Sequence, residues 1–502
     1  MPAPRLDRLA RPRRAPRGLD RARWLPRAAL LASLACASDE TEILPPPGSD
    51  GPPPDACAAG TSSSIGRESA ALTVVDRSLI GSPARYSADA TLPTREHELV
   101  TSQRARRAAA WEIAARVVAP VELDERLGPE GTRALRLWQT WHNSDDLTRI
   151  FRRLYPELTP EEQASRAPFE LAAIDAASAW NDTAVDDFEQ WTDERLAAYR
   201  SAVDSAAKQA GIGGIYRVAY GPATSHHVLE SYADLLACRE SDERVEAAPD
   251  VERTGCDAPS FEPACLEGQF PADSVLVKAS WQRLDAGTTL SAYDTSAEAL
   301  ARKLAPDGRV NWGDGDRPAA PGGDEMFTLE LPNGNRFGLT GLHIMTKELE
   351  HWVWITLWWS DRPDEDFGAD RPAGFPAPFE HYKLCSVVAF AEGDPDPAGG
   401  ADDASLASAL RATHAGVGGP TWCSNPYIER GDGNASTNCV GCHQHAGTRL
   451  DSENILADRD AFPDFSRPEL RESFPADYVF SVRTGDDLGA MLVETEEHYA
   501  SP

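Results

Sequence analysis

The sequence predicts an α+β protein in which helices and an antiparallel sheet occupy successive stretches of the chain. From about residue 98 to 240, apolar residues recur three and four positions apart, as on one face of a helix. Beyond residue 272 the pattern changes to short runs rich in β-branched and aromatic residues, which favour strands. The 502 residues suffice for roughly two to four domains. We expect a signal peptide (1–35), a Pro/Gly-rich tether (36–68), an N-terminal helical domain (69–253), an antiparallel β domain (254–395) and a short, mainly helical or loop C-terminal segment (396–502).

The N-terminus has the order of charged and apolar residues that is typical of a bacterial export signal. Residues 1–35 contain nine Arg and two Asp, and an apolar run at 28–35 precedes Cys36. The run is shorter than the roughly 20 residues that cross a bilayer. Residues 31–36 resemble a lipoprotein box, with Ser33 and Leu34 departing from the usual residues. We expect an exported, periplasmic protein tethered to a membrane by lipid on Cys36. The alternatives are a cleaved protein without lipid and a start codon placed too far upstream.

The charge balance excludes one class of partner. With 49 Lys+Arg and 80 Asp+Glu, the chain has a formal net charge of −31, and the part beyond the basic first 35 residues carries −38. Such a chain repels nucleic acid and anionic lipid head groups, so nucleic-acid binding is not expected. Electrostatic steering instead favours a basic partner protein. Within 36–68, two triple-proline runs lie among Gly, Ser and Asp, which predicts a stiff, solvated spacer.

The helical region begins several of its helices with recognisable signals. Thr159-Pro160-Glu161-Glu162 has a capping residue, a proline at the first helical position and acids near the positive end of the helix dipole. Helical spacing also occurs at 108–118, 193–210 and 228–239. We expect a helical domain without a catalytic set of residues.

Five later runs predict an antiparallel sheet. Asn333-Gly334-Asn335 is a turn signal that joins two of these runs as a hairpin. The acidic, Gly- and Pro-containing stretch 392–403 that follows the last run predicts a linker or long loop. The expected strands are 274–281, 326–331, 336–347, 352–359 and 383–391.

The C-terminal segment contains the motif that points to chemistry. Cys439-Val440-Gly441-Cys442-His443 has the Cys-x-x-Cys-His spacing of c-type haem attachment. Two thiols three positions apart can each add to one haem vinyl group, and the histidine that follows then serves as proximal iron ligand. Export agrees with this hypothesis, because bacteria attach haem c outside the cytoplasm. We expect one covalent haem c bound by Cys439, Cys442 and His443.

Two other chemistries fit a Cys-x-x-Cys pair less well. A zinc site needs a second ligand pair at similar spacing, and only Cys423 or His445 is near. A thioredoxin-like redox pair follows a strand and begins a helix within a βαβ unit, and this pattern is not visible around residue 439.

Residues 273–502 resemble a bacterial group named only as "cytochrome c family" proteins. The resemblance rests on the strand-like stretches 275–281, 341–347 and 352–356, and on a haem motif near the C-terminus. After the third stretch, relatives often have an aromatic residue, an acid and a His, whereas this chain has Leu357-Trp358-Trp359. The resemblance implies a haem protein and draws attention to His343. The His that relatives have after the third stretch is missing here, so any role it plays is absent from this chain or is taken by another residue.

The distal iron ligand remains open between several candidates. His343 and Met345 lie two apart on a predicted strand, so both project from one face. Met491 lies 48 residues beyond His443, where small cytochromes place a methionine ligand. Both methionines also have the simpler interpretation of core filling. An open sixth position is the last alternative.

Tryptophans and cysteines complete the candidate set. Trp352, Trp354, Trp358 and Trp359 favour a sheet core and alternatively line a haem pocket. Six cysteines remain besides Cys36, Cys439 and Cys442, which in an oxidising compartment favours disulfides. We expect Cys385 to pair with Cys423, and one bridge to form among Cys238, Cys256 and Cys265.

These features predict an exported monohaem c-type cytochrome that transfers electrons, with a basic redox partner. The main alternative is a haem-dependent oxidoreductase or a gas or redox sensor with an open or exchangeable distal site, because an electron carrier needs only about 100 of the 502 residues. A surface scaffold with a structural haem is a third alternative.

Overall fold

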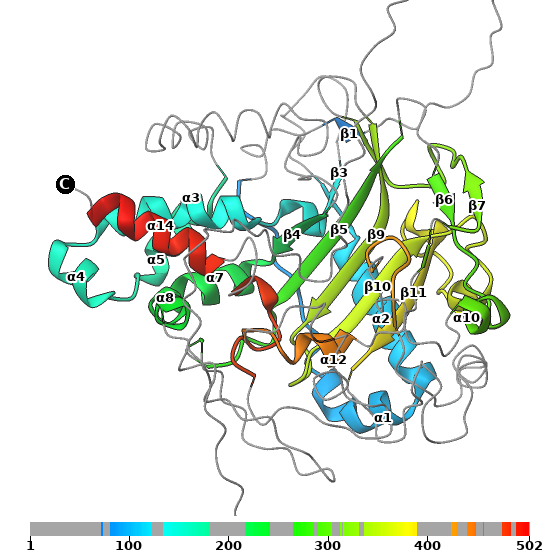
Figure 1. Ribbon diagram of the computed structural model, residues 1–502, viewed down its shortest axis with the longest axis horizontal. Coiled ribbons are helices and arrows are strands. Elements are labelled where there is room, and N and C mark those ends of the chain that lie inside the picture. The colour runs from blue at the N-terminus through cyan, green and yellow to red at the C-terminus, as the bar shows by residue number, and fades with distance from the viewer. Residues whose placement is uncertain are drawn as a thin grey trace, which may run out of the picture. The chain divides into compact units, whose positions relative to one another are not determined.

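The largest sheet joins seven strands from widely separated parts of the chain (Figure 1). On one side, the first residues of β9 pair with β8, which pairs with β1, and the later residues of β9 pair with β10, which pairs with β11. On the other side, β9 pairs with β5, which pairs with β4. All pairs are antiparallel except β1 with β8. The strands are β1 (Leu72–Thr73), β4 (Tyr216–Tyr220), β5 (Val275–Arg283), β8 (Thr328–Glu330), β9 (Arg336–Thr346), β10 (Val353–Trp359) and β11 (Tyr382–Val387).

The computed structural model has two units, Met1–Ala32 and Ser33–Pro502, and every described residue belongs to the second. The expected signal peptide, Cys36, the tether and the helix at 193–210 lie outside the described residues. The structure describes residues 72–73, 81–122, 134–180, 216–240, 265–266, 268–284, 290–303, 312–313, 315–330, 336–388, 423–429, 439–447, 455, 474–482 and 488–500.

Helices and two small sheets complete the α+β architecture that the sequence predicts. The helices are α1 (Glu96–Thr101), α2 (Gln103–Val117), α3 (Ser144–Leu154), α4 (Pro160–Ser165), α5 (Leu171–Ser178), α7 (Pro222–Glu230), α8 (Tyr232–Glu240), α10 (Ala297–Lys303), α12 (Cys439–His443) and α14 (Leu488–Ala500). The short 3-10 helices are η2 (Leu92–Arg95), η4 (Leu137–Thr140), η5 (Tyr155–Glu157), η8 (Asp366–Gly368), η9 (Phe379–His381) and η11 (Phe480–Val482). The small sheets pair β2 (Pro120–Glu122) with β3 (Ala134–Arg136) and β6 (Leu290–Ala292) with β7 (Arg317–Ala319).

Local sequence signals explain where several elements begin. Thr159 caps α4 as expected: its side chain accepts from the Glu162 amide, and the Glu162 carboxylate accepts from the Thr159 amide at 2.8 Å. The predicted hairpin is confirmed, because β8 and β9 pair in antiparallel register on either side of the Asn-Gly-Asn turn signal. All five expected strands are present as β5, β8, β9, β10 and β11.

Among the residues that the structure describes, four short strands, β1 to β4, lie within the region 69–253 that is expected to be helical, and β4 joins it to the predicted β domain. β4, which lies within the predicted helical domain, pairs antiparallel with β5 from the predicted β domain. Tertiary pairing outweighs the helical pattern of the flanking segments here, because β4 completes the hydrogen bonds of β5. The helical region therefore supplies an edge of the sheet.

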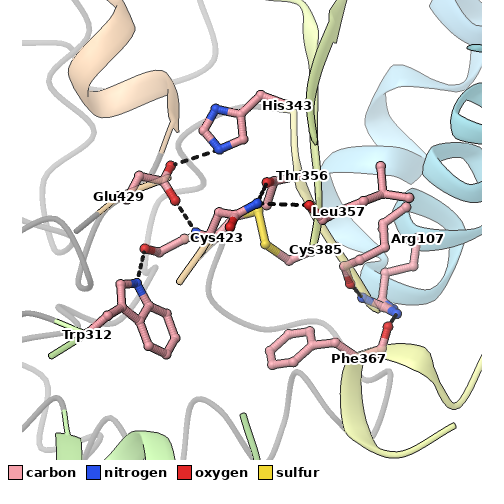
Figure 2. The surroundings of a disulfide bond; sticks show 12 residues. Arg107, Trp312, His343, Thr356, Leu357, Phe367, Cys385, Cys423 and Glu429 are labelled. Carbon is pink, nitrogen blue, oxygen red and sulfur yellow. Dashed lines mark hydrogen bonds and ion pairs between the residues drawn. A yellow bond between two sulfur atoms is a disulfide. The ribbon is translucent and has the colours of Figure 1, made fainter. Parts of the chain in front are cut away.

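The two faces of the sheet have different neighbours. Cross-strand partners share a face, so Met345 lies with Trp354, and His343 lies with Thr356. We call the face that carries these four residues the motif face. On the other face, α2 packs against β10 and β11, and its Arg107 donates to the carbonyl of Leu384. Figure 2 shows Arg107 and Leu357 on the side of the sheet away from Glu429.

Within the described ranges, none of the helices combines the length and the apolar character needed to span a bilayer.

Candidate functional site

The Cys-x-x-Cys-His motif forms its own short helix, α12. Helical spacing of three and four residues places Cys439, Cys442 and His443 on one side of the turn. Cys439 and His443 are half-buried, whereas Cys442 is only 2% exposed. The two sulfur atoms and the imidazole are thus presented together, as thioether and iron attachment at one porphyrin require.

The ring of His443 is held in a defined orientation. Its Nδ1 lies 2.8 Å from the carbonyl oxygen of Tyr478. Because a carbonyl only accepts, Nδ1 carries the proton and donates, which leaves Nε2 with its lone pair. Aromatic rings pack around the imidazole, with centroid distances of 4.6 Å to Trp354 and 5.0 Å to Phe480. A neutral histidine with Nδ1–H bound to a carbonyl is the tautomer that binds metals through Nε2.

The electrostatic surroundings also favour neutral His443. The pKa of His443 is lowered to about 4, mainly by burial and to a lesser extent by the positive charge of His343 and Lys278, although the hydrogen bond to Tyr478 acts in the opposite direction. The imidazole is therefore uncharged near pH 7, with Nε2 able to donate its electron pair. His343 and Lys278 both lie on the motif face, since His343 on β9 pairs with Lys278 on β5.

Just after the motif, at Gly447, the chain comes close to the segment that contains Tyr478. Gly447 has φ +82°, a left-handed conformation that glycine adopts without strain. A Cβ at this position would lie 2.9 Å from Cβ and 3.0 Å from the backbone nitrogen of Ala476. The missing side chain therefore lets residues 439–447 and 474–482 approach each other.

A second segment, 423–429, is fastened to the motif face by a disulfide and an amide (Figure 2). Cys423 is bonded to Cys385 on β11, which confirms the expected pair. Asn425 is fully buried, and its Nδ2 donates to Oγ1 of Thr356 at 2.8 Å and to the carbonyl of Leu357 at 2.9 Å. The segment is thereby fixed against the middle of β10.

This segment brings an acid beside His343. Nε2 of His343 lies 3.5 Å from Oε1 of Glu429, with side-chain exposures of 23% and 8% (Figure 2). The other carboxylate oxygen of Glu429 accepts the backbone amide of Asn425. The pair is close enough to His443 for the charge of His343 to affect its pKa. Sequence reasoning selected His343 but missed Glu429, because an acid in a Pro- and Gly-rich stretch carries no sequence signal for a partner.

The other distal-ligand candidates lie in two places. Met345 is 8% exposed on the motif face, directly across from Trp354. Met491 lies on α14, which packs against α3 and α8 and also contacts η11, the 3-10 helix that holds Phe480. The structure thus groups His343 and Met345 with the Trp354 that touches His443. The distal ligand itself stays a prediction.

The tryptophan run forms part of the sheet core, and one of its members also contacts His443. Trp352, Trp354, Trp358 and Trp359 are at most 4% exposed and belong to the core. Trp354 in addition forms the wall beside His443, and its Nε1 donates to the carbonyl of His351. The remaining cysteine expectation is also met, since Cys238 is bonded to Cys265. Cys36, Cys57 and Cys256 lie outside the described residues.

Among the described side chains, no group of three or more His, Cys, Asp or Glu is placed to hold a metal ion by itself. The fit to haem c depends instead on two sulfurs for covalent attachment and one imidazole nitrogen for iron. The two disulfides use four other cysteines, and the tautomer and neutrality of His443 suit an iron ligand. Comparison of the chain with protein-family models, with curated proteins and with solved structures gives no significant match.

Proposed function

We propose that this protein is an exported c-type cytochrome with one covalent haem, and that it transfers electrons. The observation that carries the proposal is the 2.8 Å hydrogen bond from Nδ1 of His443 to the Tyr478 carbonyl, within a Cys-x-x-Cys-His turn. It fixes the tautomer that binds iron through Nε2. Cys439 and Cys442 would form the thioethers, and His443 would be the proximal ligand.

The haem would supply a one-electron redox centre whose potential depends on ligands, burial and nearby charge. The chain's own residues would orient the proximal ligand. The Tyr478 carbonyl accepts the hydrogen bond from Nδ1 of His443, and Trp354 and Phe480 pack against its ring. The net charge of −31 fits a basic redox partner that is steered to the protein electrostatically. The N-terminal composition supports export to the periplasm and lipid attachment at Cys36.

A second candidate function is a haem-dependent oxidoreductase or a gas or redox sensor. The observation that favours it is the His343–Glu429 pair: Nε2, the nitrogen through which His343 would bind iron, lies 3.5 Å from the Glu429 carboxylate. If the sixth position of the haem were open beside this pair, an imidazole with a nearby carboxylate would be suited to move protons on a bound ligand.

Expression in a bacterium that matures periplasmic c-type cytochromes tests the proposal. We expect the purified chain to retain haem under denaturing conditions and to show a reduced c-type absorption spectrum. Cys439→Ala/Cys442→Ala should lose the covalent haem, whereas the matched control Cys238→Ala/Cys265→Ala should keep it. A wild-type mass without haem, in cells that load a reference cytochrome c, would refute the proposal. Carbon monoxide separates the candidates: a six-coordinate haem indifferent to it supports electron transfer, and rapid binding supports the oxidoreductase or sensor.

A further inference from the structure

A buried ion pair involves Asp477, the residue before Tyr478, whose carbonyl contacts His443. Nζ of Lys347 is 2.7 Å from Oδ1 of Asp477, with side-chain exposures of 3% and 0%. The same oxygen accepts from Nε1 of Trp352 at 2.9 Å, and Oδ2 accepts from the backbone nitrogen of Phe270 at 2.8 Å. Both carboxylate oxygens are therefore engaged, and they connect residue 477 to two separate parts of the chain, the β9–β10 connection and Phe270.

The backbone at this point has an uncommon conformation. Asp477 and Tyr478 both have positive φ, 44° and 68°, a left-handed region that side chains with a Cβ disfavour. Two such residues in succession persist only where surrounding contacts hold them. The contacts of the Asp477 carboxylate supply this restraint, since Lys347 and Trp352 donate to one of its oxygens and the Phe270 amide donates to the other.

The conformation has a direct effect on the motif, because it aims the carbonyl of Tyr478 at Nδ1 of His443. We propose that Asp477 is a positioning residue for the haem site: its buried carboxylate fixes the Tyr478 carbonyl and thereby sets the orientation and proton of the proximal histidine. The inference rests on the proposed function for its redox consequence. A strong hydrogen bond from Nδ1 makes an imidazole a better electron donor and lowers the potential of its iron.

Two variants with an uncharged residue at position 477 test whether Asp477 acts by positioning the Tyr478 carbonyl or through its negative charge. Asp477→Ala removes every side-chain contact and leaves a residue that disfavours the left-handed region. Asp477→Asn removes the same charge but keeps one acceptor oxygen, and Asn tolerates this region better than other residues. We expect the haem midpoint potential to rise clearly in Asp477→Ala and to be largely restored in Asp477→Asn. Equal shifts in the two variants would assign the effect to charge, and no shift in Asp477→Ala would also overturn the proposal.

The chain contains a closely matched control. Asp366 also has positive φ, 41°, and its carboxylate lies 2.8 Å from Nζ of buried Lys383. Lys383 lies on β11 opposite Trp358 of β10. Trp358 is four residues, or about 13 Å at strand spacing, from Trp354, which contacts His443. Asp366→Ala should leave the potential unchanged. A shift as large as that of Asp477→Ala would mean that loss of any buried Lys–Asp pair disturbs the site.

A second readout does not need the haem. In the haem-free protein, nitrogen NMR of His443 should show a slowly exchanging Nδ1 proton in wild type and in Asp477→Asn, and its loss in Asp477→Ala. If wild type acquires no haem, the proposed function fails while this measurement still decides the role of Asp477. If Asp477→Ala does not fold, Lys347→Met replaces it: positioning predicts a higher potential, whereas removal of a positive charge alone predicts a lower one.

Discussion

Asn425 and Thr356 join the segment before the motif to the middle of the sheet. Nδ2 of Asn425 lies 2.8 Å from Oγ1 of Thr356, and Oδ1 accepts the Tyr427 amide at 2.9 Å. Gly341 on β9 makes room for this amide, because a Cβ there would lie 2.8 Å from Nδ2. The buried side chain of Asn425 thus depends on the absence of a side chain at Gly341.

We expect Asn425→Ala to lower the free energy of unfolding by about 2 kcal/mol, since it leaves buried polar groups without their donor. Gly341→Ala should cost about 1–3 kcal/mol through overpacking. The double variant should cost less than the sum, because the Asn425 amide that the new methyl would meet is gone. Urea unfolding measures all three. Gly374→Ala serves as control: its Cβ would meet nothing within 4 Å, so its cost should simply add to that of Asn425→Ala.

The Cys385–Cys423 disulfide should contribute strongly to stability. It closes a loop with a sequence separation of 38, for which the chain-entropy relation gives about 4 kcal/mol. Cys385→Ala/Cys423→Ala should therefore unfold at a lower urea concentration, by that order of free energy. Non-reducing peptide mass spectrometry checks the pairing, and an unfolding curve of wild type that is identical with and without reductant would contradict the prediction.

His227 should make the fold sensitive to mild acid. Its pKa is lowered to about 4, mainly by burial and in part by the positive charge of Lys347, while a hydrogen bond to the Gly268 backbone acts in the opposite direction. The unfolded chain, with a pKa near 6.5, binds this proton more readily, so stability is full above that pH and falls as the pH drops from 6.5 to 4. The loss amounts to about 3 kcal/mol. Urea midpoints against pH should show this decline in wild type and a flatter curve in His227→Gln.

Trp354 should control the environment of His443. Trp354→Leu removes a ring that is 4% exposed and 4.6 Å from the imidazole, so we expect a loss of about 2–3 kcal/mol and a rise in the pKa of His443 from about 4 towards 6.5 in the haem-free protein. Proton NMR of the imidazole measures the pKa. Trp358→Leu, on the same face of β10 but packed on Phe367, should cost similar stability and leave that pKa unchanged.

The sequence predicts the sheet well where its signals are local. Alternating apolar runs and the Asn-Gly-Asn turn identify β8 and β9, and aromatic runs identify β10. β4 escapes prediction because five residues between two helical patterns give too short a signal, and only its pairing with β5 makes it a strand. The cysteine count and the expected oxidising compartment favour disulfides in general, but six cysteines allow 15 pairings, so the Cys385–Cys423 pair is fixed only by the fold.

The candidate site likewise has residues that the sequence identifies and contacts that it does not. Cys439, Cys442 and His443 are visible in the sequence because side-chain identity and spacing encode them. The contact from Tyr478 is not visible, because a backbone carbonyl is common to every residue and its direction depends on φ at Asp477 and Tyr478. Long-range partners such as Lys347 and Asp477, 130 residues apart, leave no periodic trace.

The depth of Cys442 has a consequence for the order of events in biogenesis. In the closed fold this residue is 2% exposed, and Gly447 brings the motif turn against Ala476 of the chain's last part. If the chain carries the proposed covalent haem, a planar group as large as a porphyrin would have to reach the Cys442 sulfur before this residue is buried. On that proposal, attachment comes first and final folding second, so cells in which the chain folds before attachment should accumulate a stable protein without haem.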